Sequence, residues 1–165
     1  TTPEKMIDFT LTDEQQMLVE MTRSFVEKEM LPHEETLEST DTLPPELAAT
    51  LRKRSMELGL HACNLPEKIG GGGLDAVSVM LIEKELGRTS LALAECAHRP
   101  LNILAACEDE QVTQFLEPTL RGEKRDCIAM TEPGAGSDLR GMKCKAVRDG
   151  DYWIINGEKI SKSIC

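Results

Sequence analysis

Residues 129–141 read A-M-T-E-P-G-A-G-S-D-L-R-G and separate two parts of the chain that differ in pattern. The centre of this stretch, T-E-P-G-A-G-S, places two glycines, a threonine and a serine where a backbone can approach a ligand closely and hydroxyls can contact it. It fits a phosphate-binding turn, and it also fits a plain glycine-rich connection. It contains no G-K-[ST], and no helical pattern follows it. Neither the Walker A loop nor the dinucleotide fingerprint therefore describes it.

The residues on either side of this stretch differ in hydrophobic period. Up to residue 122, apolar residues recur three and four positions apart, which is the spacing of amphipathic helices. From residue 127 the period falls to about two. Residues 127–131 then read as a short strand, and residues 144–156 read as a hairpin that turns on Asp149-Gly150. The sequence predicts an α+β chain.

Capping patterns mark the ends of the predicted helices. Thr12 and Gln15 have the spacing of a capping box, which places the start of a helix directly after the threonine. The ring of Pro32 cannot continue that helix. Asp75 and Asp109 each precede an apolar helical pattern, and we predict both as N-caps.

The composition argues against several classes of protein. Asp plus Glu number 29 against 19 Lys plus Arg, and the net charge of -10 disfavours binding to a nucleic-acid backbone. No apolar run reaches the roughly 18 to 20 residues that a transmembrane helix needs, so we expect no stable membrane insertion. The six cysteines form no C-x-x-C pair, which favours free thiols in a reducing, intracellular compartment.

One spacing typical of metal ligands occurs in the helical part. Glu95 and His98 form E-x-x-H, which di-iron bundles use in two copies with two further glutamates. The remaining histidines, His33 and His61, do not supply a second copy. We therefore expect no metal site.

Four segments resemble signatures of the acyl-CoA dehydrogenase family, in the family's order. T-E-P-G-A-G-S-D at residues 131–138 meets all the fixed positions of the most specific signature. L-P-E-K-I-G-G-G-G-L-D at 65–75, E-D-E-Q-V-T-Q-F-L-E-P at 108–118 and D-Y-W-I-I-N-G-E-K at 151–159 are similar to three others. The resemblance covers residues 7–159.

This resemblance implies a fold and a cofactor. The fold is an all-α, up-and-down helical domain over residues 1–125, followed over residues 126–165 by the first strands of an antiparallel β-barrel or sandwich that binds FAD. The amide of Met130, and the amide and hydroxyl of Thr131, are expected to bond the pyrimidine edge of the flavin, where negative charge gathers on reduction. The residues expected to contact FAD are Ile128, Met130, Thr131, Gly136, Ser137 and Ser163.

The resemblance also implies a reaction. A carboxylate abstracts the α-proton of an acyl-CoA, and the β-hydrogen passes as hydride to flavin N5, which leaves a trans-2-enoyl-CoA. Ser137 is expected to contact the FAD diphosphate and the CoA thioester. The family's base is a glutamate that falls beyond Cys165, so we expect an incomplete and inactive portion with no catalytic residue of its own. Glu132 belongs to the signature and is expected to fix the turn.

The sequence departs from the family after Lys159. The family continues with an aromatic residue and then a Thr or Ser that bonds the flavin. Here Ser161 replaces the aromatic, while Ser163 falls at the hydroxyl position. These two positions leave the flavin contacts of the tail open.

The implied partners are acyl-CoA, electron-transfer flavoprotein as electron acceptor, and further copies of the complete chain in a homodimer or tetramer. The implied location is cytoplasmic in a bacterium and the mitochondrial matrix in a eukaryote. Two alternatives stay open. One is a non-catalytic truncated isoform that acts as an interaction module, and the other is a flavoenzyme of the same fold, such as an acyl-CoA oxidase or nitroalkane oxidase.

Overall fold

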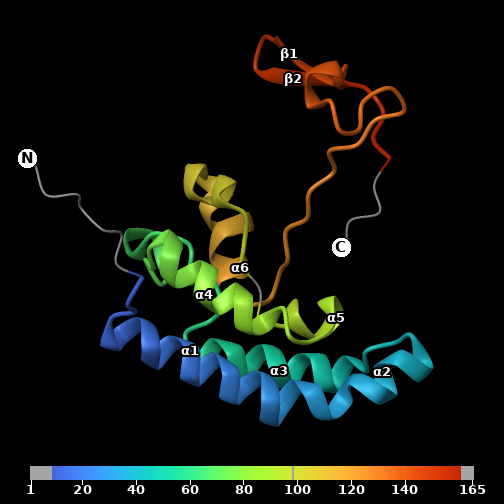
Figure 1. The fold of residues 1–165 in the computed structure, drawn as a ribbon. Coiled ribbons are helices and arrows are strands. Elements are labelled where there is room, and N and C mark those ends of the chain that lie inside the picture. Colours follow the sequence, from blue (N-terminus) through green and yellow to red (C-terminus); the bar gives the residue numbers. More distant parts are fainter. Residues whose placement is uncertain (1–8, 98, 161–165) are drawn as a thin grey trace, which may run out of the picture. The chain divides into compact units, whose positions relative to one another are not determined.

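The computed structural model describes residues 9–97 and 99–160 (Figure 1). The chain divides into two compact units, Thr1–Lys124 and Arg125–Cys165. In the described ranges the first unit is helical and the second carries an antiparallel hairpin, which confirms the predicted α+β class. None of the helices within these ranges has both the length and the apolar character that crossing a bilayer requires.

The first unit consists of helices. Its α-helices are α1 (Asp13–Phe25), α2 (Glu34–Thr40), α3 (Pro45–Glu57), α4 (Ala76–Leu86), α5 (Leu91–Ala94) and α6 (Glu117–Leu120). Shorter π- and 3-10-helical segments lie between them: η1 (Val26–Met30), η2 (Leu31–His33), η3 (Glu67–Ile69), η4 (Asn102–Ala106) and η5 (Val112–Leu116). Helix α4 packs along α1 (Figure 1).

Two of the predicted caps are confirmed. The Thr12 hydroxyl accepts a hydrogen bond from the amide of Gln15 at 3.2 Å, and the Gln15 side chain accepts one from the amide of Thr12 at 3.1 Å. Asp75 Oδ1 accepts from the amide of Val77 at 2.8 Å. Each cap satisfies amides that have no partner within the first helical turn.

One predicted helix boundary and one predicted N-cap are wrong. The helical path does not stop at Pro32 but tightens into η2 and continues as α2. Proline fits there because the first turn of a helix needs no amide donor. Asp109 has a φ of 46°, so it does not take the extended conformation of an N-cap. The side chain of Gln111 instead accepts a hydrogen bond from the amide of Glu108 at 3.2 Å.

The helices of the first unit bury two apolar clusters. Burial of each large side chain contributes about 1.5–3 kcal/mol to stability. The larger cluster includes Phe25, Val26, Met30, Leu51, Leu60, Ile82, Leu86 and Leu93. The smaller cluster contains Ala62, Leu65, Leu104 and Leu116.

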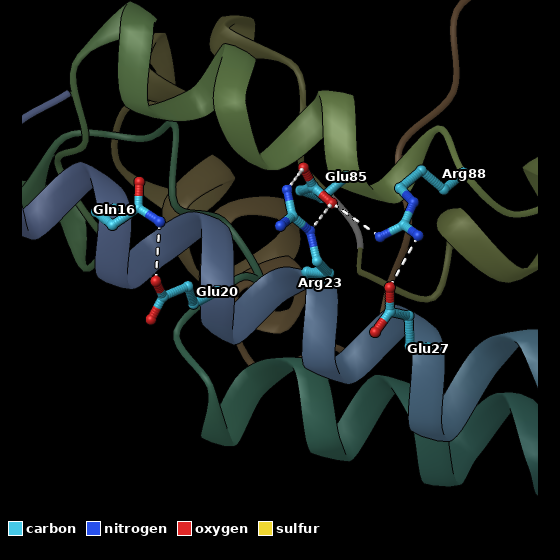
Figure 2. A network of polar contacts seen from close by, with 6 residues as sticks. All are labelled: Gln16, Glu20, Arg23, Glu27, Glu85 and Arg88. Carbon is cyan, nitrogen blue, oxygen red and sulfur yellow. Dashed lines mark hydrogen bonds and ion pairs between the residues drawn. The ribbon is translucent and has the colours of Figure 1, made fainter. Parts of the chain in front are cut away.

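An ion-pair network joins α1 and its continuation to α4 (Figure 2). Both oxygens of Glu85 accept from the Arg23 guanidinium, at 2.9 and 3.0 Å, although only 3% of the Glu85 side chain is exposed. Arg88 donates to Glu85 at 3.2 Å and to Glu27 at 2.8 Å. The hydrogen bond from Arg23 is the largest cause that lowers the pKa of Glu85 below its ordinary value, and Arg88 lowers it further. A buried carboxylate is thus kept ionised by two half-exposed arginines.

The second unit contains the hairpin of β1 (Lys145–Asp149) and β2 (Tyr152–Asn156). Asp149 pairs with Tyr152, so Gly150-Asp151 forms the loop, one residue later than predicted. Gly150 has a φ of 59°, which a type II′ turn requires at its first central position. The hairpin prediction is confirmed, and every residue of both strands is exposed.

The strand predicted over residues 127–131 is not assigned among the described residues. The carbonyl of Thr131 accepts a hydrogen bond from the amide of Ile160 at 2.8 Å, so the segment runs beside the residues that follow β2. A strand needs a continuing ladder of such pairs, and apolar alternation by itself does not supply one.

Gly157 lies where the chain leaves the hairpin and passes Cys144. Its φ is 151°, and a Cβ at this position would lie 2.1 Å from the Cys144 sulfur and 2.8 Å from the Cys144 Cα. Glycine therefore permits a backbone approach that a side chain would block.

Candidate functional site

The signature stretch forms a tight turn in the second unit. The amide of Glu132 donates to the carbonyl of Ala135 at 2.9 Å, and the amide of Ala135 donates back at 3.1 Å. Pro133 and Gly134 occupy the tip between these paired residues. Proline is common at the first position after such a pair because its ring already fixes φ near the value that the turn requires.

The carboxylate of Glu132 holds this turn to the segment that precedes β1. It accepts from the amide of Lys143 at 2.6 Å and from the amide of Cys144 at 3.0 Å. A third donor is the ammonium of Lys159, at 2.9 Å. The Glu132 side chain is only 6% exposed, so these bonds compensate its removal from water. Glu132 fixes the turn, as its place in the signature predicts.

The same three donors keep this carboxyl ionised. The amide of Lys143, the ammonium of Lys159 and the amide of Cys144 lower the pKa of Glu132 from 4.5 to about 2. The same carboxylate raises the pKa of the neighbouring Cys144 thiol. A carboxylate with so low a pKa is a poor proton acceptor, so its position is that of an anchor.

Two residues after the hairpin anchor the carbonyls at the start of the turn. Lys159 Nζ donates to the carbonyl of Met130 at 3.0 Å and lies 3.5 Å from the sulfur of Met142. The amide of Ile160 donates to the carbonyl of Thr131 at 2.8 Å. Residues 130 and 131 are therefore tied to the chain through their carbonyls.

The amides around the turn behave differently from these carbonyls. Within the part of the chain that the structure describes, the amides of Met130, Thr131, Gly136 and Ser137 donate no hydrogen bond to another protein group. All four residues are exposed. Because Glu132 pairs with Ala135, the residues on either side of that pair are brought together at the base of the turn.

Space around the turn is open. An added Cβ at Gly134 or at Gly136 would meet no atom within 4 Å. The exposed fraction is 45% for Ile128 and also 45% for Met130. Ser163, the sixth residue expected to contact a cofactor, lies outside the described residues.

Two features bear on the site residues named from the sequence. The segment at residues 151–159 includes Lys159, but the sequence does not indicate its contact with Glu132, since 27 residues separate the two. The signal available was a glutamate inside a glycine-rich turn, which needs a donor if it is buried.

As for metal, the described residues contain no group of three or more His, Cys, Asp or Glu side chains placed to bind one. His98 of the E-x-x-H spacing lies outside the described residues.

Two family models match successive parts of this sequence. The model described as "Acyl-CoA dehydrogenase, N-terminal domain" matches residues 12–123. The model described as "Acyl-CoA dehydrogenase, middle domain" matches residues 127–163, which include the whole turn.

Individual relatives agree with these models. The Bacillus subtilis (strain 168) protein named "Probable acyl-CoA dehydrogenase YngJ" is 38% identical over 160 residues, which are 93% of this chain and 40% of the relative. A subunit of the caffeyl-CoA reductase-Etf complex of Acetobacterium woodii is 30% identical over 90% of this chain and 40% of its own length.

A solved structure has the same fold. The crystal structure of an acyl-CoA dehydrogenase complexed with FAD from Bacillus anthracis superimposes with a TM-score of 0.69 at 33% identity. The match covers 96% of this chain and 27% of that chain. The present chain thus spans less than half the length of each of these relatives.

Proposed function

The chain belongs to the acyl-CoA dehydrogenase family of oxidoreductases, and we propose that it provides the flavin-contacting turn of an enzyme that converts an acyl-CoA thioester to a trans-2-enoyl-CoA. The observation that carries this proposal is the turn at residues 130–137. Its carboxylate and two of its carbonyls are anchored within the chain, while four amides at its base have no protein acceptor among the described residues. Anchored acceptors with free donors are the arrangement that an electron-rich ligand needs.

FAD is the cofactor, and the residues of the turn fit it. Unpaired amides and hydroxyls can bond the polar edge of a flavin or the oxygens of a diphosphate. The lack of a Cβ at Gly134 and Gly136 leaves room for close approach. When bound, FAD supplies the hydride acceptor for the reaction.

Different residues of the turn contact different parts of FAD. The amides of Met130 and Thr131 donate to the pyrimidine edge of the flavin, and the Thr131 hydroxyl adds a further donor. Gly136 and Ser137 donate to the diphosphate, and the Ser137 hydroxyl also contacts the CoA thioester. Fixed donors at the pyrimidine edge favour the state in which that edge carries negative charge.

The substrate is an acyl-CoA and the electron partner is an electron-transfer flavoprotein. The names of the relatives support both, since they include acyl-CoA dehydrogenases and a subunit of a reductase-Etf complex.

A titration with FAD tests this proposal. We expect flavin fluorescence to change on binding, and we expect Thr131→Val and Ser137→Ala each to weaken binding about three- to tenfold, because each loses one hydrogen bond. Thr50→Val is the control, since its hydroxyl donates to the carbonyl of Glu46 within α3. Its affinity for FAD should equal that of the unchanged protein.

The alternative of an interaction module rests on one observation. Tyr152, Trp153 and Ile155 of the hairpin are each more than 60% exposed, being 79%, 64% and 76%. Exposed apolar surface of this kind marks contact sites. A protein that takes up no FAD, and whose variants at Thr131 and Ser137 behave alike, would overturn the flavin proposal in favour of this module.

A further inference from the structure

Lys159 donates a hydrogen bond to one end of the peptide group that joins Met130 to Thr131. The carbonyl of Met130 and the amide of Thr131 belong to the same peptide unit, and Lys159 Nζ donates to that carbonyl at 3.0 Å. The amide at the other end has no acceptor among the described residues. Lys159 therefore contacts one end of a peptide group whose other end, the Thr131 amide, has no acceptor in the part of the chain that the structure describes.

Hydrogen bonds that share a peptide unit strengthen each other. A charged donor at the carbonyl draws electron density toward oxygen and leaves the N–H more positive, so the amide becomes a better donor. Lys159 thereby raises the donor strength of Thr131 without touching the acceptor that Thr131 serves. The effect requires that the ammonium stay on the carbonyl.

Glu132 keeps the ammonium there. Its Oε1 lies 2.9 Å from Lys159 Nζ, and the Lys159 side chain is only 29% exposed. Glu132 also accepts from the amides of Lys143 and Cys144, so the carboxylate shares its charge among three donors. The cation is therefore held in place by a carboxylate that also accepts from two backbone amides.

We propose that Lys159 is a positioning residue that changes the redox preference of the flavin through the Met130–Thr131 peptide. Glu132 holds the Lys159 ammonium on the Met130 carbonyl. This inference rests on the proposed function, in which the Thr131 amide donates to the pyrimidine edge. Reduction adds negative charge at that edge, so a stronger donor favours reduced flavin over oxidised flavin. Lys159 consequently raises the midpoint potential of the bound flavin.

The first experiment needs no flavin. In Lys159→Met, which keeps the aliphatic stem and removes the charge, the carbonyl carbon of Met130 should shift upfield in the NMR spectrum and the amide of Thr131 should shift with it. Lys145→Met removes the same charge at the start of β1 and should leave both resonances in place. Unchanged amide resonances for β2 show that Lys159→Met is folded.

The second experiment measures the midpoint potential with FAD bound. We expect Lys159→Met to weaken binding of reduced flavin about tenfold more than binding of oxidised flavin, which lowers the potential by about 30 mV. Lys159→Arg restores a charged donor and should recover most of the loss. Glu132→Gln should lower the potential in the same direction, and Lys145→Met should not.

The outcomes separate this inference from the proposed function. If Lys159 only holds the turn together, both redox states lose affinity equally and the potential does not move, which overturns the inference while FAD binding stands. If Met130 and Thr131 show no shift in Lys159→Met, the polarised peptide is also ruled out. If the unchanged protein takes up no FAD, the proposed function fails, and the tuning of a flavin fails with it.

Discussion

At the scale of single residues, surroundings decide what a carboxylate does. Glu132 lies in the segment where a catalytic carboxylate would be sought first, yet three donors occupy it. These donors remove both its basicity and its freedom to move. The sequence supports the same role, because a glutamate inside a glycine-rich signature is best explained as part of the turn.

Acid should release this anchor. The folded-state pKa of Glu132 is lowered to about 2 from an ordinary 4.5, so its contribution to stability is complete above about pH 4.5 and is lost as the pH falls toward 2. We expect the carboxyl carbon of Glu132 to titrate near pH 2 by NMR, together with the amides of Lys143 and Cys144. A midpoint near 4.5 for that carbon would contradict the anchored geometry.

At the scale of elements, the contacts between α1 and α4 combine apolar packing with a buried charge. Arg23 and Arg88 converge on Glu85 (Figure 2), and the network is shared by two helices that are far apart in sequence. Removing one partner from such a cluster leaves a charge that is poorly solvated.

We expect Glu85→Gln to lower the free energy of unfolding by about 1–2 kcal/mol, a modest value because both arginines remain half exposed and can turn to water. Denaturant unfolding followed by circular dichroism measures it. Glu38→Gln is the control, since this exposed carboxylate lies on α2 and not on the helices that carry the network. The idea fails if both variants lose the same stability.

The hairpin depends on one backbone conformation. Gly150 has a φ of 59° and no atom within 4 Å of an added Cβ, so Gly150→Ala tests conformation without a clash. We expect a loss of about 1–2 kcal/mol of hairpin stability, seen as weaker cross-strand NMR contacts between Ala146 and Ile155. Asp151→Ala, at the neighbouring position with an ordinary φ, should keep those contacts.

Local patterns explain which elements could be predicted. The capping box of Thr12 and the hairpin over residues 145–156 depend on neighbours in sequence, so spacing alone reveals them. The strand expected over 127–131 depends on a ladder that composition does not specify, and Asp109 takes a left-handed conformation that its sequence context does not indicate.

At the scale of the whole molecule, the described cysteines form no disulfide and differ in burial. Cys127 is exposed, Cys63 and Cys96 are buried, and burial raises the pKa of the Cys63 thiol. Thiolate rather than thiol reacts with alkylating reagents.

Among the described cysteines, iodoacetamide should therefore modify Cys127 first. We expect Cys63 and Cys96 to react about tenfold or more slowly until the protein unfolds. Cys144 should lag behind Cys127, because Glu132 raises its pKa. Peptide mass mapping over time measures the order, and equal rates for Cys63 and Cys127 in the native protein would show that the helical core is not packed as described.

The candidate site was predictable in part, for a related reason. The turn is a contiguous motif, so residues 130–137 could be named from the sequence, and their contacts with FAD stay a prediction. The bond from Lys159 to Met130 spans 29 positions and depends on how the hairpin brings its ends together. Only folding reveals such a contact.

The contact between Lys159 and the turn also limits which residue can occupy position 157. The chain reaches Lys159 only by passing Cys144 so closely that no Cβ can be accommodated. Random mutation at this position should be tolerated worse than at Lys159 itself, where an arginine can still donate. Among the residues that hold the turn in place, Gly157 is then the least replaceable, although it has no side chain.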